Sequence, residues 1–264
     1  EINSFFHDIS TDPYYTAPEL DKIPEGTRVP TLTVEMVSKF LQNKKCTSSG
    51  PDDLPHWFWG EFGVELAPTI TKIFNSSLRR AKVPTVWKRA DLIPVPKEAT
   101  LENCNQLRPI SLTDIIMRLF EKCVYKTEIA HIIRDILDSD QFAYKGCHDT
   151  IMALIKCQHS SLKWLENRAR YVRVFSFDFK KAFDCVPHDI LCSKLKNLPL
   201  NSYSINWIVN FLDDRQQRVK VDGTRTDYVN INRGVPQGTV LGPVLFSVMI
   251  NDIKTVNAQN ELVK

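Results

Sequence analysis

An aspartate at the end of an alternating apolar segment is the first residue of this sequence that could do chemistry. The segment reads YVRVFSFDFKKAFD over residues 171–184, and Val172 and Val174 alternate with polar positions before Asp178. This alternation predicts a half-buried strand, because Val and Phe favour a pleated surface. A carboxylate delivered by such a strand is costly unless a cation compensates it, and a divalent metal is the usual partner. Taken alone, the pattern favours a plainer interpretation, a strand that ends in a capping Asp and is followed by a core aromatic, Phe183.

A second stretch of the sequence favours a functional interpretation over this plainer one. Residues 233–253 read RGVPQGTVLGPVLFSVMINDI, in which glycines and prolines precede an apolar helix through Val244 and Met249. Glycines let a backbone approach a ligand closely, and a loop that leads into a helix presents free amide groups. Gln237 lies in the middle of this loop with an amide that can both donate and accept hydrogen bonds. The stretch therefore predicts a ligand-binding loop.

Together these two stretches resemble the palm motifs of reverse transcriptases. FDFKKAFD (residues 177–184, here the FDF motif) and GVPQGTVLGPVLF (residues 234–246, here the PQG motif) are most similar to those of LINE-type, non-LTR retrotransposons of the jockey and CR1 kind. The resemblance implies an RNA-directed DNA polymerase that transfers deoxynucleotides to a primer through two Mg²⁺ ions. Its expected partners are an RNA template with a DNA primer and deoxynucleoside triphosphates.

The resemblance also implies a role for individual residues. Asp178 would bind metal through its carboxylate, together with the backbone carbonyl of Phe179. Phe183 would pack under the sugar and exclude a 2′-hydroxyl group. Gln237 and Gly238 would contact the nucleotide or the template base.

Two basic residues before these motifs match positions of the same family that hold the incoming triphosphate. They are Lys97, after a predicted strand over 90–95, and Arg108, within LRPISL at 107–112. Lysine offers a point charge and arginine a planar fork for phosphate oxygens. The alternative for both is a solvated surface charge, as expected for most of the other Lys and Arg residues.

The fold implied by the resemblance is α+β, a right-hand polymerase with helix-rich fingers around a partial palm, a split βαβ antiparallel sheet, and with the thumb absent. Residues 1–30 are rich in Pro and acids and are expected to be a linker from an upstream region. Residues 31–170 would form an N-terminal extension and fingers, and residues 171–264 an incomplete palm.

Local patterns predict further elements. Thr33 can cap a short helix, and other helices are expected over about 68–78, 114–137, 151–165, 189–198 and 202–212. Two strands, 216–221 and 227–231, should form a hairpin around Asp222-Gly223. DQFAYKGCHDT, residues 140–150, resembles the template-gripping loop of the family, but Asp149 stands where that family has Ser, which counts against a contact with the template.

The third palm motif of the family, an aromatic-Ala-Asp-Asp hairpin, is expected near the point where the sequence stops, and ELVK at 261–264 resembles its incoming strand. Asp213-Asp214 precedes the PQG motif and is therefore expected to be solvated surface. Two alternatives to a reverse transcriptase stay open. One is a catalytically inactive nucleic-acid-binding remnant, and the other is an RNA-templated RNA polymerase, whose sugar-sensing residue would be polar rather than Phe183.

Composition sets weak bounds on these interpretations. The 264 residues carry a formal net charge of +3, but residues 79–134 hold eleven basic against six acidic residues, which favours a phosphate-binding surface there. The seven cysteines form no regular framework and are expected to be free thiols of an intracellular protein, nuclear or cytoplasmic. No apolar run approaches the roughly 20 residues of a membrane span, so no membrane association is expected.

Overall fold

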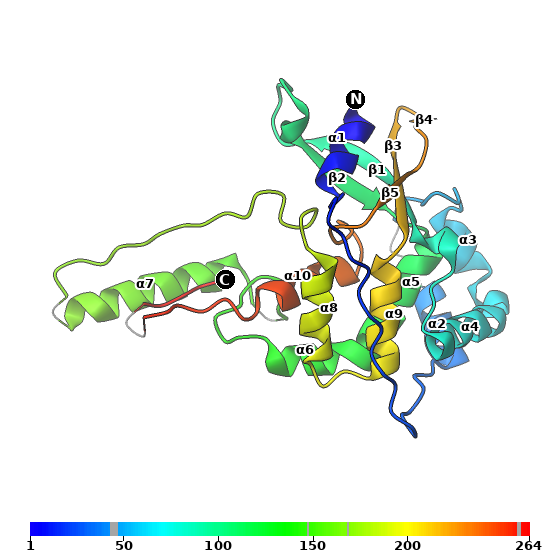
Figure 1. Cartoon of the computed structure of the whole chain (residues 1–264), viewed down its shortest axis with the longest axis horizontal. Helices are drawn as coiled ribbons and strands as arrows, with labels where there is room; N and C mark the ends of the chain where they lie inside the picture. The colour runs from blue at the N-terminus through cyan, green and yellow to red at the C-terminus, as the bar shows by residue number, and fades with distance from the viewer. Residues whose placement is uncertain (43–46, 147, 168, 258–259) are drawn as a thin grey trace.

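The computed structural model describes residues 1–42, 47–146, 148–167, 169–257 and 260–264. Helices and a mixed sheet together make an α+β fold (Figure 1). The α-helices of the described residues are α1 (Ile2–Ile9), α2 (Val34–Leu41), α3 (His56–Glu61), α4 (Gly63–Arg80), α5 (Ile115–Val124), α6 (Ala130–Ile136), α7 (Thr150–Glu166), α8 (His188–Lys196), α9 (Ser202–Leu212) and α10 (Leu241–Ile250). No helix among these is long and apolar enough to cross a membrane.

The sheet combines strands from two distant parts of the chain. Its strands are β1 (Arg89–Pro96), β2 (Leu107–Leu112), β3 (Arg215–Val221), β4 (Thr224–Arg225) and β5 (Val229–Ile231). The order is β2-β1-β3-β4, and β5 also pairs with β3. β1 is antiparallel to β2 but parallel to β3, so the sheet is mixed rather than wholly antiparallel as expected. Strands from residues assigned above to fingers and to palm thus share one sheet.

The predicted hairpin is confirmed. β3 pairs antiparallel with β4 and β5, and the tight turn lies at Asp222-Gly223, where both residues have positive φ, +47° and +80°. Glycine adopts such angles at little cost, which is why Asp-Gly favours this turn. Thr33 also caps its helix as predicted, because its side chain accepts a hydrogen bond from the Met36 amide at 3.3 Å.

The main core lies under the helices and is centred on α5. The ring of Phe120 stacks on Phe74 of α4 at 4.0 Å between centroids, and meets Trp207 of α9 edge-on at 4.8 Å. All three side chains are fully buried. The helix expected over 114–137 is divided into α5, a π-helical turn (Tyr125–Ile129) and α6.

Helix α1 packs on the sheet and forms a second, smaller core. Phe6 is 2% exposed and packs with Leu92, Leu107 and Val219. The Ser10 carbonyl accepts hydrogen bonds from the Asn232 and Arg233 amides at 3.2 and 3.1 Å. The first residues of the expected linker are therefore a folded helix, with irregular chain following it to residue 33.

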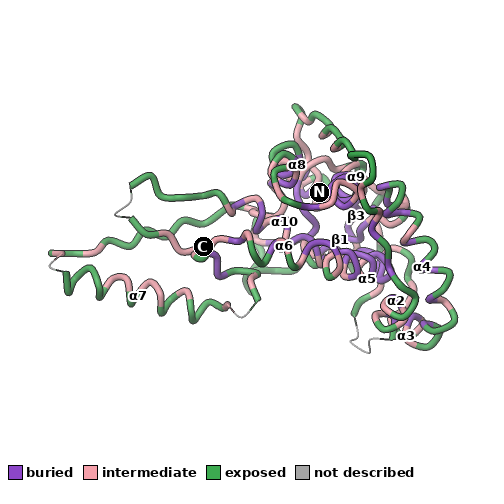
Figure 2. Tube along the Cα trace, turned by 90° about the horizontal axis from the view of Figure 1, so that it is seen from below, coloured by how far each residue is buried: buried purple, intermediate pink, exposed green. Residues whose placement is uncertain are grey.

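Helix α7 and the segment after it extend away from this body as an arm (Figures 1 and 2). Residues 171–179 carry no strand, so the prediction of a half-buried strand leading to Asp178 is wrong for this structure. Its alternating residues are exposed instead, including Val174 at 73% and Phe177 at 87%. A strand needs hydrogen-bonded neighbours, and none of the described strands pairs with this segment.

Asp149, in the segment that resembles the template-gripping loop, is the N-cap of α7. Its carboxylate accepts a hydrogen bond from the Met152 amide at 2.8 Å, so helix capping accounts for an acid at this position. Of the cysteines, Cys104, Cys123, Cys157, Cys185 and Cys192 are free, whereas Cys46 and Cys147 lie outside the described residues.

Candidate nucleotide-binding site

The FDF and PQG motifs, far apart in the sequence, lie against each other in the structure. The Val235 amide donates a hydrogen bond to the Phe183 carbonyl at 2.8 Å, and the Gly234 amide donates to Val186 at 2.9 Å. Gly234 has a φ of +89°, and a Cβ atom there would lie 2.7 Å from the Asp184 carbonyl oxygen. Only glycine permits so close an approach of the two backbones. The structure therefore explains the first glycine of the PQG motif.

Gln237 joins three segments. Its Nε2 lies 3.3 Å from each carboxylate oxygen of Asp184, and its backbone carbonyl accepts a hydrogen bond from the Ser111 amide of β2 at 2.9 Å. Gly238, with a φ of +96°, lies so close to β2 that a Cβ atom would be 3.2 Å from the Ser111 carbonyl. The loop is thus held between β2 and the end of the FDF motif.

The Asp184 carboxylate lies in a partly dehydrated, cationic environment. Burial raises the pKa of this carboxyl to about 6, while Lys181, the hydrogen bond from Gln237 and Lys97 lower it. Lys97 therefore contributes its charge at this site, although its Nζ also donates to the Asn105 carbonyl at 2.9 Å. The Lys181 ammonium lies 3.9 Å from the centre of the Phe5 ring, which ties α1 to the same place.

Aromatic rings cover one side of this junction. Phe183 stacks on Phe246 of α10, with centroids 5.0 Å apart and an interplanar angle of 23°. Tyr144 meets the Phe183 ring edge-on at 6.0 Å, and Phe179 meets Phe246 edge-on, also at 6.0 Å. Phe183 is partly buried by these neighbours, whereas Phe179 is 55% exposed.

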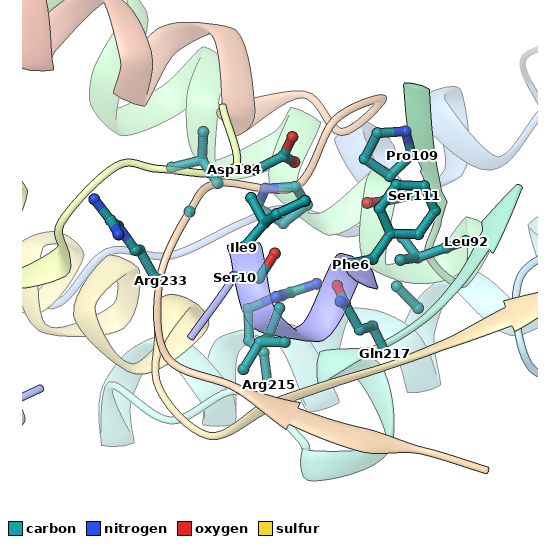
Figure 3. A pocket seen from close by; sticks show the side chains of 15 residues that line it. Phe6, Ile9, Ser10, Leu92, Pro109, Ser111, Asp184, Arg215, Gln217 and Arg233 are labelled. Atoms are coloured by element: carbon teal, nitrogen blue, oxygen red, sulfur yellow. The ribbon is translucent and has the colours of Figure 1, made fainter. Parts of the chain in front are cut away.

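A small cavity lies beside the junction, between α1 and the sheet (Figure 3). Its volume is about 30 Å³, room for about one water molecule. Asp184 lies on one side of it in Figure 3, and Arg215 and Gln217 of β3 on the other. A larger open pocket of about 200 Å³ lies between α6, α8 and α10, and its lining contains no residue of either motif. It includes Leu137, Lys194, Leu198 and Asp252.

The predicted site residues divide into two groups. Phe183, Gln237 and Gly238 lie at the junction, and Lys97 is close enough to influence Asp184. Arg108 is exposed on β2, opposite Val95 of β1, and forms no salt bridge with any described residue. Asp178 is exposed on the extended segment, and its carboxylate has no hydrogen bond or ion pair within the described ranges.

Sequence reasoning missed Asp184 as a site residue. It is the last residue of the FDF motif, and a signal for it was present in Gln237. A glutamine amide in a glycine-rich loop needs an acceptor when it is shielded from water, and a carboxylate at the end of the neighbouring motif can supply one. Lys181 was likewise missed, although its charge lowers the pKa of Asp184.

Comparisons with known proteins show which family the sequence matches. Residues 95–262 match the family described as "Reverse transcriptase (RNA-dependent DNA polymerase)", a range that includes both motifs. The chain is 33% identical over 186 residues to "RNA-directed DNA polymerase from mobile element jockey" of Drosophila melanogaster, covering 69% of this chain and 20% of that protein. It is 32% identical over 190 residues to "Probable RNA-directed DNA polymerase from transposon BS" of the same species, covering 70% and 20%.

A third relative comes from another organism. The chain is 30% identical over 177 residues to "Retrovirus-related Pol polyprotein from type-1 retrotransposable element R2" of Popillia japonica, covering 67% of this chain and 24% of that protein. The chain thus spans about a fifth to a quarter of the length of these relatives. The match over most of the chain shows that it belongs to the reverse transcriptase family, as a domain of the LINE-type, non-LTR retrotransposon kind.

Proposed function

We propose that this chain is part of an RNA-directed DNA polymerase that binds an RNA template, a DNA primer and the incoming deoxynucleotide. The single observation that carries the proposal is the junction of the FDF and PQG motifs through Gln237 and Asp184. It places a polar amide, a half-buried carboxylate and an aromatic ring around one short stretch of backbone. The amide and the ring suit a base edge and a sugar, and the ammonium groups of Lys181 and Lys97 beside the carboxylate suit a charged phosphate chain.

Each residue then has a role. Phe183 would contact the sugar from its position on Phe246, with no space for a 2′-hydroxyl group. Gln237 and Gly238 would contact the nucleotide or the template base. Lys97, near Asp184, and Arg108, exposed on β2, would attract the triphosphate. In this proposal residues 31–170 are the N-terminal extension and fingers, and residues 171–264 are part of the palm.

The family implies a divalent metal, and Mg²⁺ is the ion we expect. Asp178 and the Phe179 carbonyl would be the residues of this chain that hold it. The described residues contain no group of three or more His, Cys, Asp or Glu side chains placed to bind one ion. One exposed carboxylate does not fit a complete metal site by itself. We therefore assign to the described residues the binding of primer–template and nucleotide, and no chemical step.

The proposal is tested by binding rather than by synthesis. An RNA template annealed to a fluorescent DNA primer is titrated with the chain, in Mg²⁺, with and without the next complementary nucleotide. We expect the affinity to fall steeply as salt rises, because phosphate contacts release counterions. The complementary deoxynucleotide should tighten binding at least tenfold, and a non-complementary one should not.

The same titration separates the alternatives. An inactive nucleic-acid-binding remnant would bind primer–template equally well with and without nucleotide. An RNA polymerase would gain more affinity from the complementary ribonucleotide than from the deoxynucleotide. Arg108→Ala should weaken nucleotide-dependent binding, whereas Lys72→Ala, which removes an exposed cation of α4 outside residues 79–134, should not.

A further inference from the structure

A buried acid outside both motifs contacts the end of the PQG loop. Glu121 lies on α5, in the centre of the main core, and its side chain is fully inaccessible to solvent. Its Oε2 accepts a hydrogen bond from the Val240 amide at 3.1 Å and another from the Leu241 amide at 3.0 Å. These amides open α10, immediately after the loop that carries Gln237.

These contacts supply what α10 lacks. The first amides of a helix have no partner within the helix and need an acceptor from elsewhere. The N-cap of α10 is Val240, whose side chain has no oxygen, and no side-chain cap is formed there. Thr239 provides part of the solution, because its Oγ accepts a hydrogen bond from the Gly242 amide at 3.2 Å. Glu121 provides the rest, from a helix 120 residues away in sequence from Leu241.

The position is a costly one for a carboxylate. Burial raises the pKa of Glu121 to about 7, while the Leu241 amide, Arg215 and the Val240 amide lower it. Arg215 of β3 is itself only 2% exposed, and its Nη1 donates to the Phe211 carbonyl at 3.2 Å. The charge of Arg215 favours the ionised form of Glu121. Both hydrogen bonds that the carboxylate accepts come from amides at the end of the loop.

We propose that Glu121 is a positioning residue for the loop of residues 233–240. Backbone hydrogen bonds to Phe183 and Val186 hold the beginning of this loop, and Glu121 holds its end. Gln237 lies between these two attachments. That the loop so held binds a nucleotide rests on the proposed function, whereas the attachment itself does not.

Amide hydrogen exchange of the 264-residue chain tests the attachment directly, without nucleotide. Glu121→Met removes the acceptor at similar volume, and Glu121→Gln keeps one oxygen that can accept both amides. Glu128→Met is the matched control, because Glu128 is also buried in the following helical turn but binds Arg28, at 2.7 Å, rather than the loop. The double variant Glu121→Met/Arg215→Met removes both buried charges, so that no unpaired arginine is left to unfold the protein.

We expect protection of the Val240 and Leu241 amides to fall at least tenfold in Glu121→Met and in the double variant. It should stay within about twofold of the parent in Glu121→Gln and Glu128→Met. Unchanged protection in the folded double variant would overturn the proposal, and so would an equal loss in Glu128→Met. Because exchange is measured without nucleotide, a failure of nucleotide binding would overturn the proposed function and leave this result as it stands.

Discussion

The Nε2 atom of Gln237 lies 3.3 Å from both carboxylate oxygens of Asp184, a contact between residues 53 positions apart. It is the polar link between the FDF and PQG motifs, and it is made beside two backbone hydrogen bonds between the same segments. The contact requires Gln237 to be the hydrogen-bond donor and the Asp184 carboxylate to be the acceptor. That requirement gives the first prediction.

Gln237→Glu should destabilise the protein at pH 8 by about 1–3 kcal/mol, because it places a second carboxylate against Asp184 and removes the donor. At pH 5 the loss should be smaller, since the Asp184 carboxyl, with a pKa raised to about 6 by burial, is then protonated and can donate instead. Urea unfolding at the two pH values measures both losses.

The double variant Asp184→Asn/Gln237→Glu exchanges donor and acceptor and is the control. It should recover most of the stability lost at pH 8. An equal loss at both pH values, with no recovery in the double variant, would show that the contact contributes nothing.

Gly234→Ala should cost about 2–4 kcal/mol in the free energy of unfolding, because the new methyl group would overlap the Asp184 backbone at a positive φ. Gly26→Ala separates the two causes. Gly26 also has a positive φ, +80°, but a Cβ atom there meets nothing within 4 Å. It should cost only about 1 kcal/mol. Equal losses at the two glycines would contradict the close packing of the motifs.

The stability of Asp114→Asn, compared with that of the parent protein, should increase as pH rises. Asp114 is 4% exposed, and burial, with Asp52 and Asp91 nearby, raises the pKa of its carboxyl to about 6. Between about pH 4 and pH 6 the folded protein therefore binds more protons at this group than the unfolded chain, and its contribution to stability is lost as pH rises. Asparagine does not titrate, and its oxygen can still accept from the Asp52 amide as Asp114 does at 3.1 Å.

Urea unfolding at pH 4.5 and pH 7.5 checks this. The variant should match the parent at the lower pH and exceed it at the higher by on the order of 2 kcal/mol. Asp135→Asn, which changes an exposed acid of α6, should alter stability equally little at both. If the free energy of unfolding changes equally with pH in the parent and in Asp114→Asn, the proposed contribution of Asp114 is ruled out.

Phe183→Ala should weaken discrimination against ribonucleotides in the primer–template titration, because it opens the space that a 2′-hydroxyl group needs. Loss of a partly buried aromatic also costs stability, so a second aromatic serves as control. Phe58→Ala removes a ring that packs against the core near α3, far from both motifs in sequence. It should leave the preference for deoxynucleotides unchanged. A folded Phe183→Ala variant with the parent's preference would favour a purely structural role for this ring.

Much of the fold could be predicted from local patterns. The apolar periodicity of α4, α7, α8 and α9, the cap at Thr33 and the Asp222-Gly223 turn each depend on neighbouring residues, and each is found. The segment before Asp178 could not be predicted in this way. Its alternation is genuine, but a strand depends on a partner strand, and a single segment does not reveal whether one is in reach.

Only those parts of the site that belong to local motifs could be predicted. Phe183, Gln237 and Gly238 belong to recognisable motifs, and the structure brings them together. Asp184 and Glu121 act through contacts with residues 53 and about 120 positions away. Gln237 gave a signal for Asp184, but no local pattern marks Glu121. Glu121 reads in sequence as one of three charged residues of α5, beside Arg118 and Lys122. Its complete burial and its two accepted hydrogen bonds distinguish it.

Photocrosslinking can locate the incoming nucleotide, which we propose binds at the junction of the FDF and PQG motifs. A deoxynucleotide with a photoreactive base is bound to the chain with primer–template, irradiated, and its attachment sites are found by mass spectrometry. We expect crosslinks within residues 179–184 and 234–239, and we expect excess complementary deoxynucleotide to abolish them. Crosslinks concentrated instead at the pocket of Lys194 and Asp252, or equally strong without primer–template, would contradict this proposal.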